Sequence, residues 1–268
     1  MDGVVTRSEG GTTVDRLNAL GKVTAIIEAV TVESRLTRIA NAVELPASTV
    51  HRILQELVNL GWVRTDARRG YTLGPRLLAI GARASEGTSL LNVADPLLRN
   101  LRDATGHTVH MAVRQQDEMV YLSKVEGQRA YEMRSHVGGT VPLHCTAVGK
   151  CLLAALPAGE VRSIVKRTGL PRHTDRTITD VEELLEHLET VRRNGFATDN
   201  EEYESHVRCV GALVVDPNGL PAASVSVSSL SFDVNATRLR RHAKLVVAAA
   251  HQISRALGVP LDESERSG

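Results

Sequence analysis

The chain has 268 residues, of which 42% are hydrophobic and 24% charged, and its formal net charge is +1. This composition excludes a disordered chain and a protein too small to bury a hydrophobic core. The length exceeds what one compact core usually needs, so we expect two domains, one of them small. The aromatic content of 3% argues against an aromatic ligand cage or a base-stacking surface.

Neither a membrane span nor a disulfide framework is indicated. No apolar run approaches the about 18 to 20 residues that a transmembrane helix needs, and the first seven residues lack the pattern of a signal peptide. The three cysteines, Cys145, Cys151 and Cys209, show no CxxC spacing, which argues against a disulfide framework and a zinc ribbon. We therefore expect a cytoplasmic protein that uses no metal or organic cofactor.

Basic residues exceed acidic residues only in the first quarter of the chain. Between Val14 and Arg76 there are nine Lys or Arg residues and six Asp or Glu residues. Such a surplus is a weak indication of phosphate binding and more often belongs to an ordinary solvated surface.

Two helices are predicted after a loose tail over residues 1–13. Apolar residues at helical spacing extend from residue 14 to residue 30, and a second, short helix covers residues 36–43. Leu45-Pro46 ends the second helix, because proline lacks an amide donor and disfavours helical backbone at the residue before it.

A third helix is predicted from Ala47 to Gly61, with Ser48 or Thr49 as its cap. At about 100 degrees per residue its side chains separate into an apolar and a polar stripe. The apolar stripe contains Val50, Ile53, Leu54, Leu57 and Leu60, and the polar stripe contains Ser48, His51, Arg52, Gln55 and Asn59. A merely solvated helix would carry more Glu and Lys than this polar stripe does.

Two short strands follow, over residues 62–64 and 71–73, and the turn between them contains Arg68 and Arg69. Three helices followed by a basic hairpin predict a winged helix-turn-helix domain over residues 14–76.

The third helix has the residue types that read DNA. A helix fits the major groove, where Arg, Gln and Ser form hydrogen bonds with base edges. We expect Arg68 and Arg69 to meet phosphate or the minor groove. The alternative is a helical packing module whose third helix faces solvent, but the order of helix, turn, helix and basic wing favours DNA binding. The residues predicted to contact DNA are Ser48, Thr49, His51, Arg52, Gln55, Arg68 and Arg69.

A linker helix is predicted over residues 77–94, ending at Asp95-Pro96, and a second domain over residues 95–260, before a tail at 261–268. Strands are expected at residues 107–114, 119–125, 131–135, 196–199, 207–215 and 222–229, and helices at 96–105, 146–156, 160–168, 180–194 and 236–257. Strands that are adjacent in sequence, with full-length helices between them, favour an α+β sheet domain.

The sequence lacks the familiar catalytic motifs. Gly149-Lys150 does not continue into a phosphate-binding loop, because His144 and Cys151 occupy its key positions, and neither GxSxG nor HExxH occurs. His144, Cys145 and Cys151 could hold zinc in principle, but the thiols fall in an apolar helical pattern that favours ordinary packing. We therefore expect no enzyme.

Two segments have features of a ligand pocket. Thr146 can cap a helix whose first amides, at Ala147, Val148 and Gly149, would be free to bind a carboxylate. Strand alternation directs Ser226 and Ser228 to one face, although an ordinary half-exposed strand would show the same spacing.

Several stretches of the chain resemble the IclR family of bacterial transcriptional regulators, from about Val14 to Leu257. They are residues 45–54 (LPASTVHRIL), 71–77 (YTLGPRL), 143–150 (LHCTAVGK), 176–180 (RTITD) and 207–212 (VRCVGA). The resemblance implies a winged helix-turn-helix, a linker helix and a GAF-like effector-binding domain. It also implies a homodimer or dimer of dimers on palindromic operators, with repression more frequent than activation, under the control of a small organic or aromatic acid.

By this resemblance the effector pocket maps onto Met133, Val141, Ala147, Val148, Asp199, Val207, Cys209, Ser226 and Ser228. Asp199 would accept from a ligand hydroxyl or hold the two serines. The chain departs from the family at Cys145, where Ala is frequent, and at Ser229-Leu230, where Gly-Pro is common.

Three classes of function compete. A regulator needs sequence-specific DNA binding, an enzyme needs a nucleophile or metal constellation that the sequence does not display, and a metabolite-binding module would not need the basic wing. The sequence therefore predicts a DNA-binding regulator with a small-molecule effector.

Overall fold

The computed structural model describes residues 18–66, 70–86, 89–128 and 135–259 of the chain. It divides into two compact units after Gly87. No helix within these described ranges combines the length and the apolar character that crossing a membrane requires.

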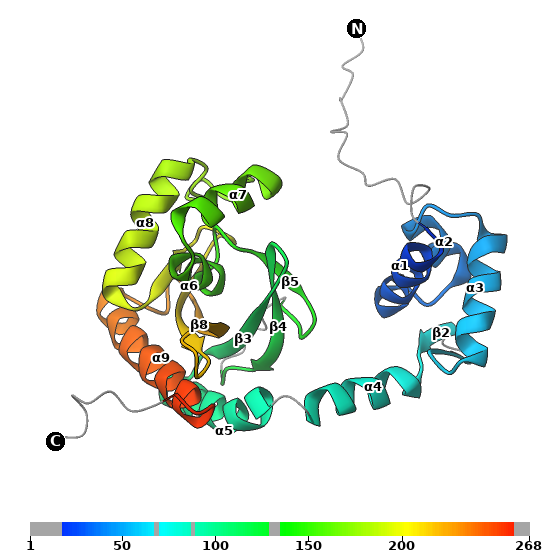
Figure 1. Cartoon of the computed structure of the whole chain (residues 1–268), viewed down its shortest axis with the longest axis horizontal. Helices are drawn as coiled ribbons and strands as arrows, with labels where there is room; N and C mark the ends of the chain where they lie inside the picture. The colour runs from blue at the N-terminus through cyan, green and yellow to red at the C-terminus, as the bar shows by residue number, and fades with distance from the viewer. Residues whose placement is uncertain (1–17, 67–69, 87–88, 129–134, 260–268) are drawn as a thin grey trace, which may run out of the picture. The chain divides into compact units, whose positions relative to one another are not determined.

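The N-terminal unit is a three-helix winged helix-turn-helix (Figure 1). Its elements are α1 (Ala19–Val32), α2 (Leu36–Ala42), α3 (Ala47–Asn59), β1 (Val63–Asp66) and β2 (Gly70–Leu73), and the two strands pair antiparallel. Ile26, Ile39 and Leu54, one from each helix, are completely buried in its core. The predicted fold of this unit is confirmed.

The start of α3 differs from the prediction. The helix begins directly after Pro46, whose carbonyl accepts from the amides of Thr49 and Val50, and no side chain caps it. Ser48 and Thr49 are the second and third residues of the helix, and Pro46 occupies the capping position, so neither hydroxyl can cap the helix.

The break between the next two helices also lies at a different place from the one predicted. Helix α4 covers Pro75–Glu86, and α5 covers Ser89–Thr105 and runs through Pro96 without a break. Leu90, Ala94 and Leu98 of α5 are buried in one continuous core stripe. Burial of this stripe outweighs the hydrogen bond that Pro96 removes, so the boundary expected at Asp95-Pro96 is wrong.

The described residues of the C-terminal unit form one curled antiparallel sheet of six strands in the order β5-β4-β3-β8-β7-β6. The strands are β3 (Thr108–Gln115), β4 (Glu118–Val125), β5 (Thr140–Pro142), β6 (Ala197–Asn200), β7 (Val207–Val215) and β8 (Pro221–Leu230). The predicted α+β class is confirmed. The short β5 was not predicted, and the strand expected at 131–135 lies outside the described residues except for Ser135, which is not in a strand.

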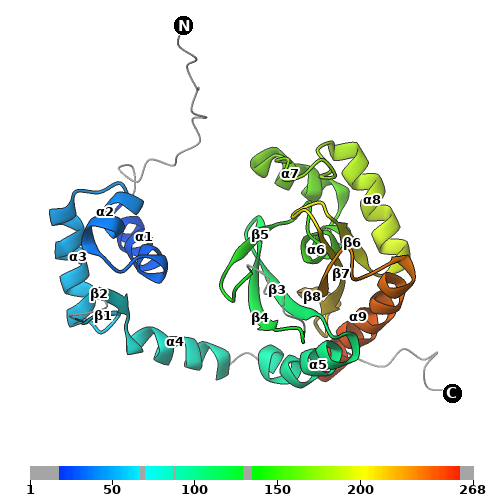
Figure 2. The same cartoon turned by 180° about the vertical axis from the view of Figure 1, so that it is seen from behind.

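Helices cover both faces of this sheet (Figure 2). Helices α5 and α9 (Ala236–Ala256) pack side by side on one face, and α6 (Ala147–Ala155), α7 (Ala158–Thr168) and α8 (Val181–Asn194) belong to the other. Val225 and Val227 of β8 face the α5–α9 core, so the alternate residues Ser226 and Ser228 face the side of α6.

Candidate functional site

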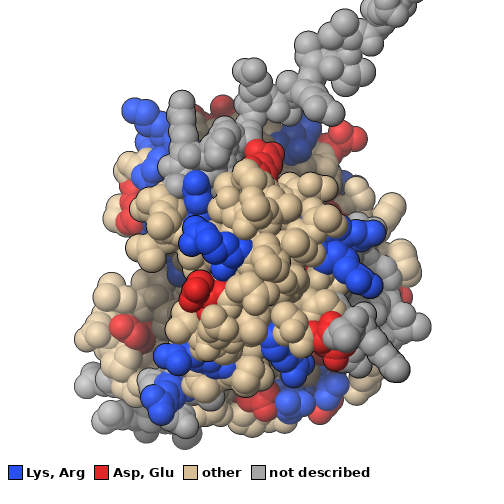
Figure 3. All heavy atoms as spheres, turned by 90° about the vertical axis from the view of Figure 1, so that its right-hand side faces the viewer, with Lys and Arg blue, Asp and Glu red and all other residues tan. Residues whose placement is uncertain are grey.

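Helix α3 presents the polar face that the sequence predicts. Val50, Leu54 and Leu57 are buried, whereas the polar residues of the opposite stripe, Ser48, His51, Arg52, Gln55 and Asn59, are exposed. Thr49 is half-buried. Arg68 and Arg69 lie outside the described residues. In the view of Figure 3, basic side chains are scattered, with acidic ones between them, and do not gather in one block.

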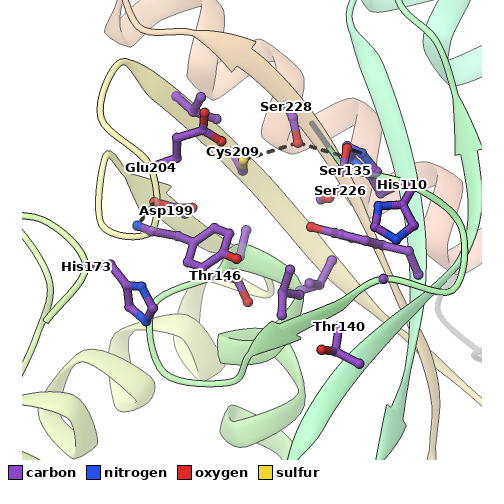
Figure 4. Close-up of a pocket in the computed structure, with 18 residues that line it drawn as sticks. His110, Ser135, Thr140, Thr146, His173, Asp199, Glu204, Cys209, Ser226 and Ser228 are labelled. Atoms are coloured by element: carbon purple, nitrogen blue, oxygen red, sulfur yellow. Dashed lines mark hydrogen bonds between the residues drawn. The ribbon is translucent and has the colours of Figure 1, made fainter. Parts of the chain in front are cut away.

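A cavity of about 390 Å³ lies in the C-terminal unit, on the sheet face that carries α6. All six strands β3 to β8, the start of α6 and the connections before β5, α8 and β7 contribute to its walls (Figure 4). Eight of the nine residues predicted for an effector pocket line this one cavity: Val141, Ala147, Val148, Asp199, Val207, Cys209, Ser226 and Ser228. The ninth, Met133, lies outside the described residues.

The start of α6 opens into the cavity with two free amides. The Thr146 hydroxyl accepts from the amide of Gly149 at 3.1 Å and donates to the carbonyl of Pro142 at 2.7 Å. The amide of Gly149 is therefore engaged, and the prediction that it is free is wrong. Ala147 and Val148 have no backbone hydrogen-bond acceptor among the described residues, so their amides are available to an anion.

Close backbone contacts fix the position of this helix start. A Cβ at Gly149 would lie 2.4 Å from the Leu143 carbonyl oxygen, and one at Gly211 of β7 would lie 3.2 Å from the carbonyl carbon of Ala147. Glycine at both positions lets α6 approach the preceding loop and the sheet, which brings its amides to the cavity wall.

A hydrogen-bonded chain of side chains forms the far wall of the cavity (Figure 4). The Cys209 thiol donates to Ser228 Oγ at 3.2 Å, Ser228 Oγ lies 3.3 Å from His110 Nδ1, and His110 Nε2 lies 2.8 Å from Ser135 Oγ. Burial lowers the pKa of His110 to about 3 and raises the pKa of the Cys209 thiol, so both are neutral near pH 7. In contrast, the Ser226 hydroxyl has no hydrogen-bond partner among the described residues, so it is available to a ligand.

Asp199 is held by the backbone rather than by the serines. Its Oδ1 accepts from the amides of Glu202 at 2.8 Å and Tyr203 at 3.4 Å. The expectation that Asp199 fixes Ser226 and Ser228 is therefore not met. Burial raises the pKa of Asp199 to about 7, so a large share of this carboxyl is protonated at neutral pH.

Aromatic rings line the cavity despite the low aromatic content. Tyr121 lies 4.7 Å from His110 between ring centroids, and Tyr203 lies 5.1 Å from His173. Two of the four tyrosines of the chain thus meet at this cavity. The low aromatic content argued against an aromatic ligand cage, but composition does not report where the few rings of a chain cluster. These residues had no sequence signal of their own.

A buried ion pair supports the cavity wall from behind. Lys150 of α6 is completely buried, and its Nζ lies 2.6 Å from both carboxylate oxygens of Glu202. The hydroxyls of Thr174 and Thr177 donate to the Glu202 carbonyl at 3.2 and 2.7 Å. The segment that carries Asp199 and Tyr203 is thereby tied to α6 and to the connection before α8.

Comparison with known proteins covers both units. The model of the IclR helix-turn-helix domain matches residues 19–67, and that of the bacterial transcriptional regulator IclR C-terminal domain matches residues 82–255. The HTH-type transcriptional regulator KdgR of Escherichia coli is 34% identical over 247 residues, which are 91% of this chain and 94% of that protein. The transcriptional repressor IclR of Escherichia coli is 31% identical over 226 residues, 83% of this chain and 82% of that protein.

The fold also matches a solved structure of an IclR homologue from Microbacterium hydrocarbonoxydans in complex with 4-hydroxybenzoate. The TM-score is 0.80 and the sequence identity 23%, and the match covers 90% of this chain and 99% of that one.

Proposed function

The chain belongs to the IclR family of bacterial transcriptional regulators, and from this premise we propose that the cavity of its C-terminal unit binds a small organic acid that controls DNA binding by α3. The observation that carries this proposal is the convergence on one cavity of two helix amides and the Ser226 hydroxyl, none of which has a hydrogen-bond partner among the described residues. Repression fits the names of the relatives, and a regulator of DNA acts in the cytoplasm, where bacterial DNA lies.

An anion in this cavity would be held by neutral donors, beside the half-buried Glu204 side chain. No Lys or Arg occurs among the described residues of its wall, so a bound carboxylate depends on several converging hydrogen bonds. The amides of Ala147 and Val148 receive the carboxylate, and Ser226 and Ser228 hold the rest of the ligand. The protonated form of Asp199 spares the anion a buried negative neighbour and can donate to it.

The rings of Tyr121, Tyr203, His110 and His173 suit a flat ligand as well as an aliphatic one. 4-Hydroxybenzoate, the molecule held by the Microbacterium homologue, is therefore a suitable first probe, beside acids chosen from the chemistry of the neighbouring genes. The cavity has a binding role in this proposal, without catalysis.

Replacement of Ser226 by Ala tests the pocket. We expect effector affinity to fall about tenfold or more, because one hydrogen bond to a charged group contributes about 1.5–3 kcal/mol. Calorimetry with the acid that binds the wild type best measures the loss. Ser224→Ala is the matched control, since Ser224 lies on the same face of β8 but does not line the cavity. Equal affinity of wild type and Ser226→Ala, or a cationic ligand, would contradict the assignment.

We propose that Ser48, Thr49, His51, Arg52 and Gln55 read the operator and that Arg68 and Arg69 contact phosphate or the minor groove. The exposure of the α3 polar stripe and the order of the elements support this assignment.

We further propose that two or four copies act together on a palindromic operator. One winged helix buries only about 600–1,000 Å² on DNA, which is small for specific regulation. Leu20 of α1 and Leu78 of α4 are 77% and 76% exposed, and a second copy would cover such apolar surface. Light scattering should give a dimer or tetramer at micromolar concentration, with footprints over two half-sites. A monomer that protects one half-site would refute this assembly.

A further inference from the structure

Three potential metal ligands meet beside the cavity. His144 and Cys145 lie on the connection between β5 and α6, and His173 lies on the connection between α7 and α8. One ligand atom from each residue lies within 4.8 Å of the other two. In the part of the chain that the structure describes, no other group of three His, Cys, Asp or Glu side chains has this spacing. The sequence placed Cys151 near His144 and Cys145 and favoured ordinary packing for the thiols, whereas the fold brings His173 to this place.

The hydrogen bond of His144 leaves one ring nitrogen ready for a metal. His144 Nε2 lies 3.1 Å from the Pro171 carbonyl oxygen, which can only accept, so Nε2 carries the proton. In the neutral ring Nδ1 then keeps its lone pair. A carbonyl that fixes the second nitrogen in this way is the usual partner of a metal-binding histidine.

The spacing of the three side chains is close to that of a tetrahedral zinc site. Zn–N bonds of about 2.0–2.1 Å and a Zn–S bond of about 2.3 Å place ligand atoms about 3.3–3.6 Å apart. In the structure the three ligand atoms lie within 4.8 Å of one another, which is little more than about 1 Å beyond the distance in a zinc site. Rotation of the exposed His173 side chain can remove this difference. The His144 and His173 rings already tilt toward each other by 38° at a centroid distance of 6.0 Å.

The backbone around the ligands is well held. Cys145 is completely buried and directly precedes the capping residue Thr146. The amide of His173 donates to Thr177 Oγ1 at 3.0 Å, and this hydroxyl donates to the carbonyl of Glu202. Both chain segments that supply ligands are thus tied to the cavity wall.

We propose that His144, Cys145 and His173 bind a zinc ion whose fourth coordination position opens into the cavity. One thiolate and two imidazoles are a ligand set that zinc prefers, and three protein ligands leave one position for water or a ligand oxygen. His173 itself lines the cavity (Figure 4), so this position faces the proposed effector. Coordination of another effector oxygen by the zinc ion, beside the carboxylate at the α6 amides, rests on the proposed function, whereas zinc binding itself does not.

Metal titration of the untagged, chelator-treated full chain tests the site. We expect one zinc ion per chain in competition with a chromophoric chelator. Co²⁺ in its place should give the near-ultraviolet thiolate charge-transfer band and the intense visible bands of tetrahedral cobalt. Cys145→Ser should abolish the charge-transfer band, and His173→Gln should weaken zinc binding by about 100-fold or more, beyond the usual effect of an outer-shell change.

Matched controls separate this site from other thiols and imidazoles. Cys151→Ser and His136→Gln should bind as the wild type does, because Cys151 lies outside the ligand group and His136 lines the cavity without belonging to it. If Cys145→Ser does not fold, the exposed His173→Gln still decides the matter. Absence of stoichiometric binding by the wild type, or unchanged zinc affinity in His173→Gln, would overturn the site. The titration contains no effector, so its failure would leave the Ser226→Ala result untouched.

Discussion

Replacement of Lys150 by Met should lower the free energy of unfolding of the C-terminal unit by about 3–5 kcal/mol. Lys150 is 0% exposed and Glu202 7% exposed, and the ammonium contacts both carboxylate oxygens at 2.6 Å. Without Lys150, the Asn200 amide at 3.2 Å is the one donor to the Glu202 carboxylate among the described residues. An unpaired buried carboxylate is far more costly than the loss of an exposed ion pair.

Urea denaturation followed by two signals measures this effect. Trp62, the single tryptophan of the chain, reports on the N-terminal unit, whereas far-ultraviolet circular dichroism reports on both units. Lys150→Met should move the dichroism transition of the C-terminal unit and leave the Trp62 transition in place. The double variant Lys150→Met/Glu202→Gln should recover part of the stability, because no unpaired charge remains. If the free energy of unfolding falls by less than about 1 kcal/mol in the single variant, the Lys150–Glu202 pair does not stabilise the C-terminal unit as proposed.

Replacement of Arg52 by Ala should cost about 1–3 kcal/mol of discrimination between operator and scrambled DNA. Arg52 lies at the centre of the exposed stripe of α3, and it forms no ion pair within the described residues. Its guanidinium is therefore free to donate two hydrogen bonds to a guanine edge in the major groove. Loss of these bonds removes specificity together with affinity.

Gel shifts on operator and scrambled DNA at several salt concentrations separate base reading from phosphate binding. Arg52→Ala should reduce the ratio of the two affinities. Arg68→Ala and Arg69→Ala should weaken both affinities alike and reduce the dependence on salt. Arg240→Ala removes the same charge from an exposed position of α9 and should change neither. Operator affinity that is unchanged in Arg52→Ala would refute the assignment of α3 as the recognition helix.

Local patterns predicted most of the elements that matter for function. The polar stripe of α3 and the alternation of Ser226 with Val227 follow from periods of about 3.6 and 2 residues, and both are present in the structure. The helix boundary at Asp95-Pro96 was predicted wrongly, because the packing of α5 on the core, a tertiary contact, keeps this segment helical.

The parts of the site that depend on distant pairs could not be predicted. Lys150 stands out as a charge in an apolar helix, but only the fold identifies Glu202 as its partner 52 residues away. The same holds for Tyr121 and Tyr203, which come to one cavity from different strands and loops. Long-range pairing of this kind leaves no periodic signal in a single sequence.

The most direct test of the central claim is the coupling between the cavity and the operator. Operator affinity is measured by fluorescence anisotropy with and without a saturating acid, and acid affinity by calorimetry with and without a duplex selected from random DNA. We predict the same factor in both directions, about 5- to 150-fold, because linkage between two binding sites is reciprocal. Binding of an acid in the cavity is shown by a weaker affinity for that acid in Ser226→Ala. If such an acid leaves operator affinity unchanged, the account is contradicted.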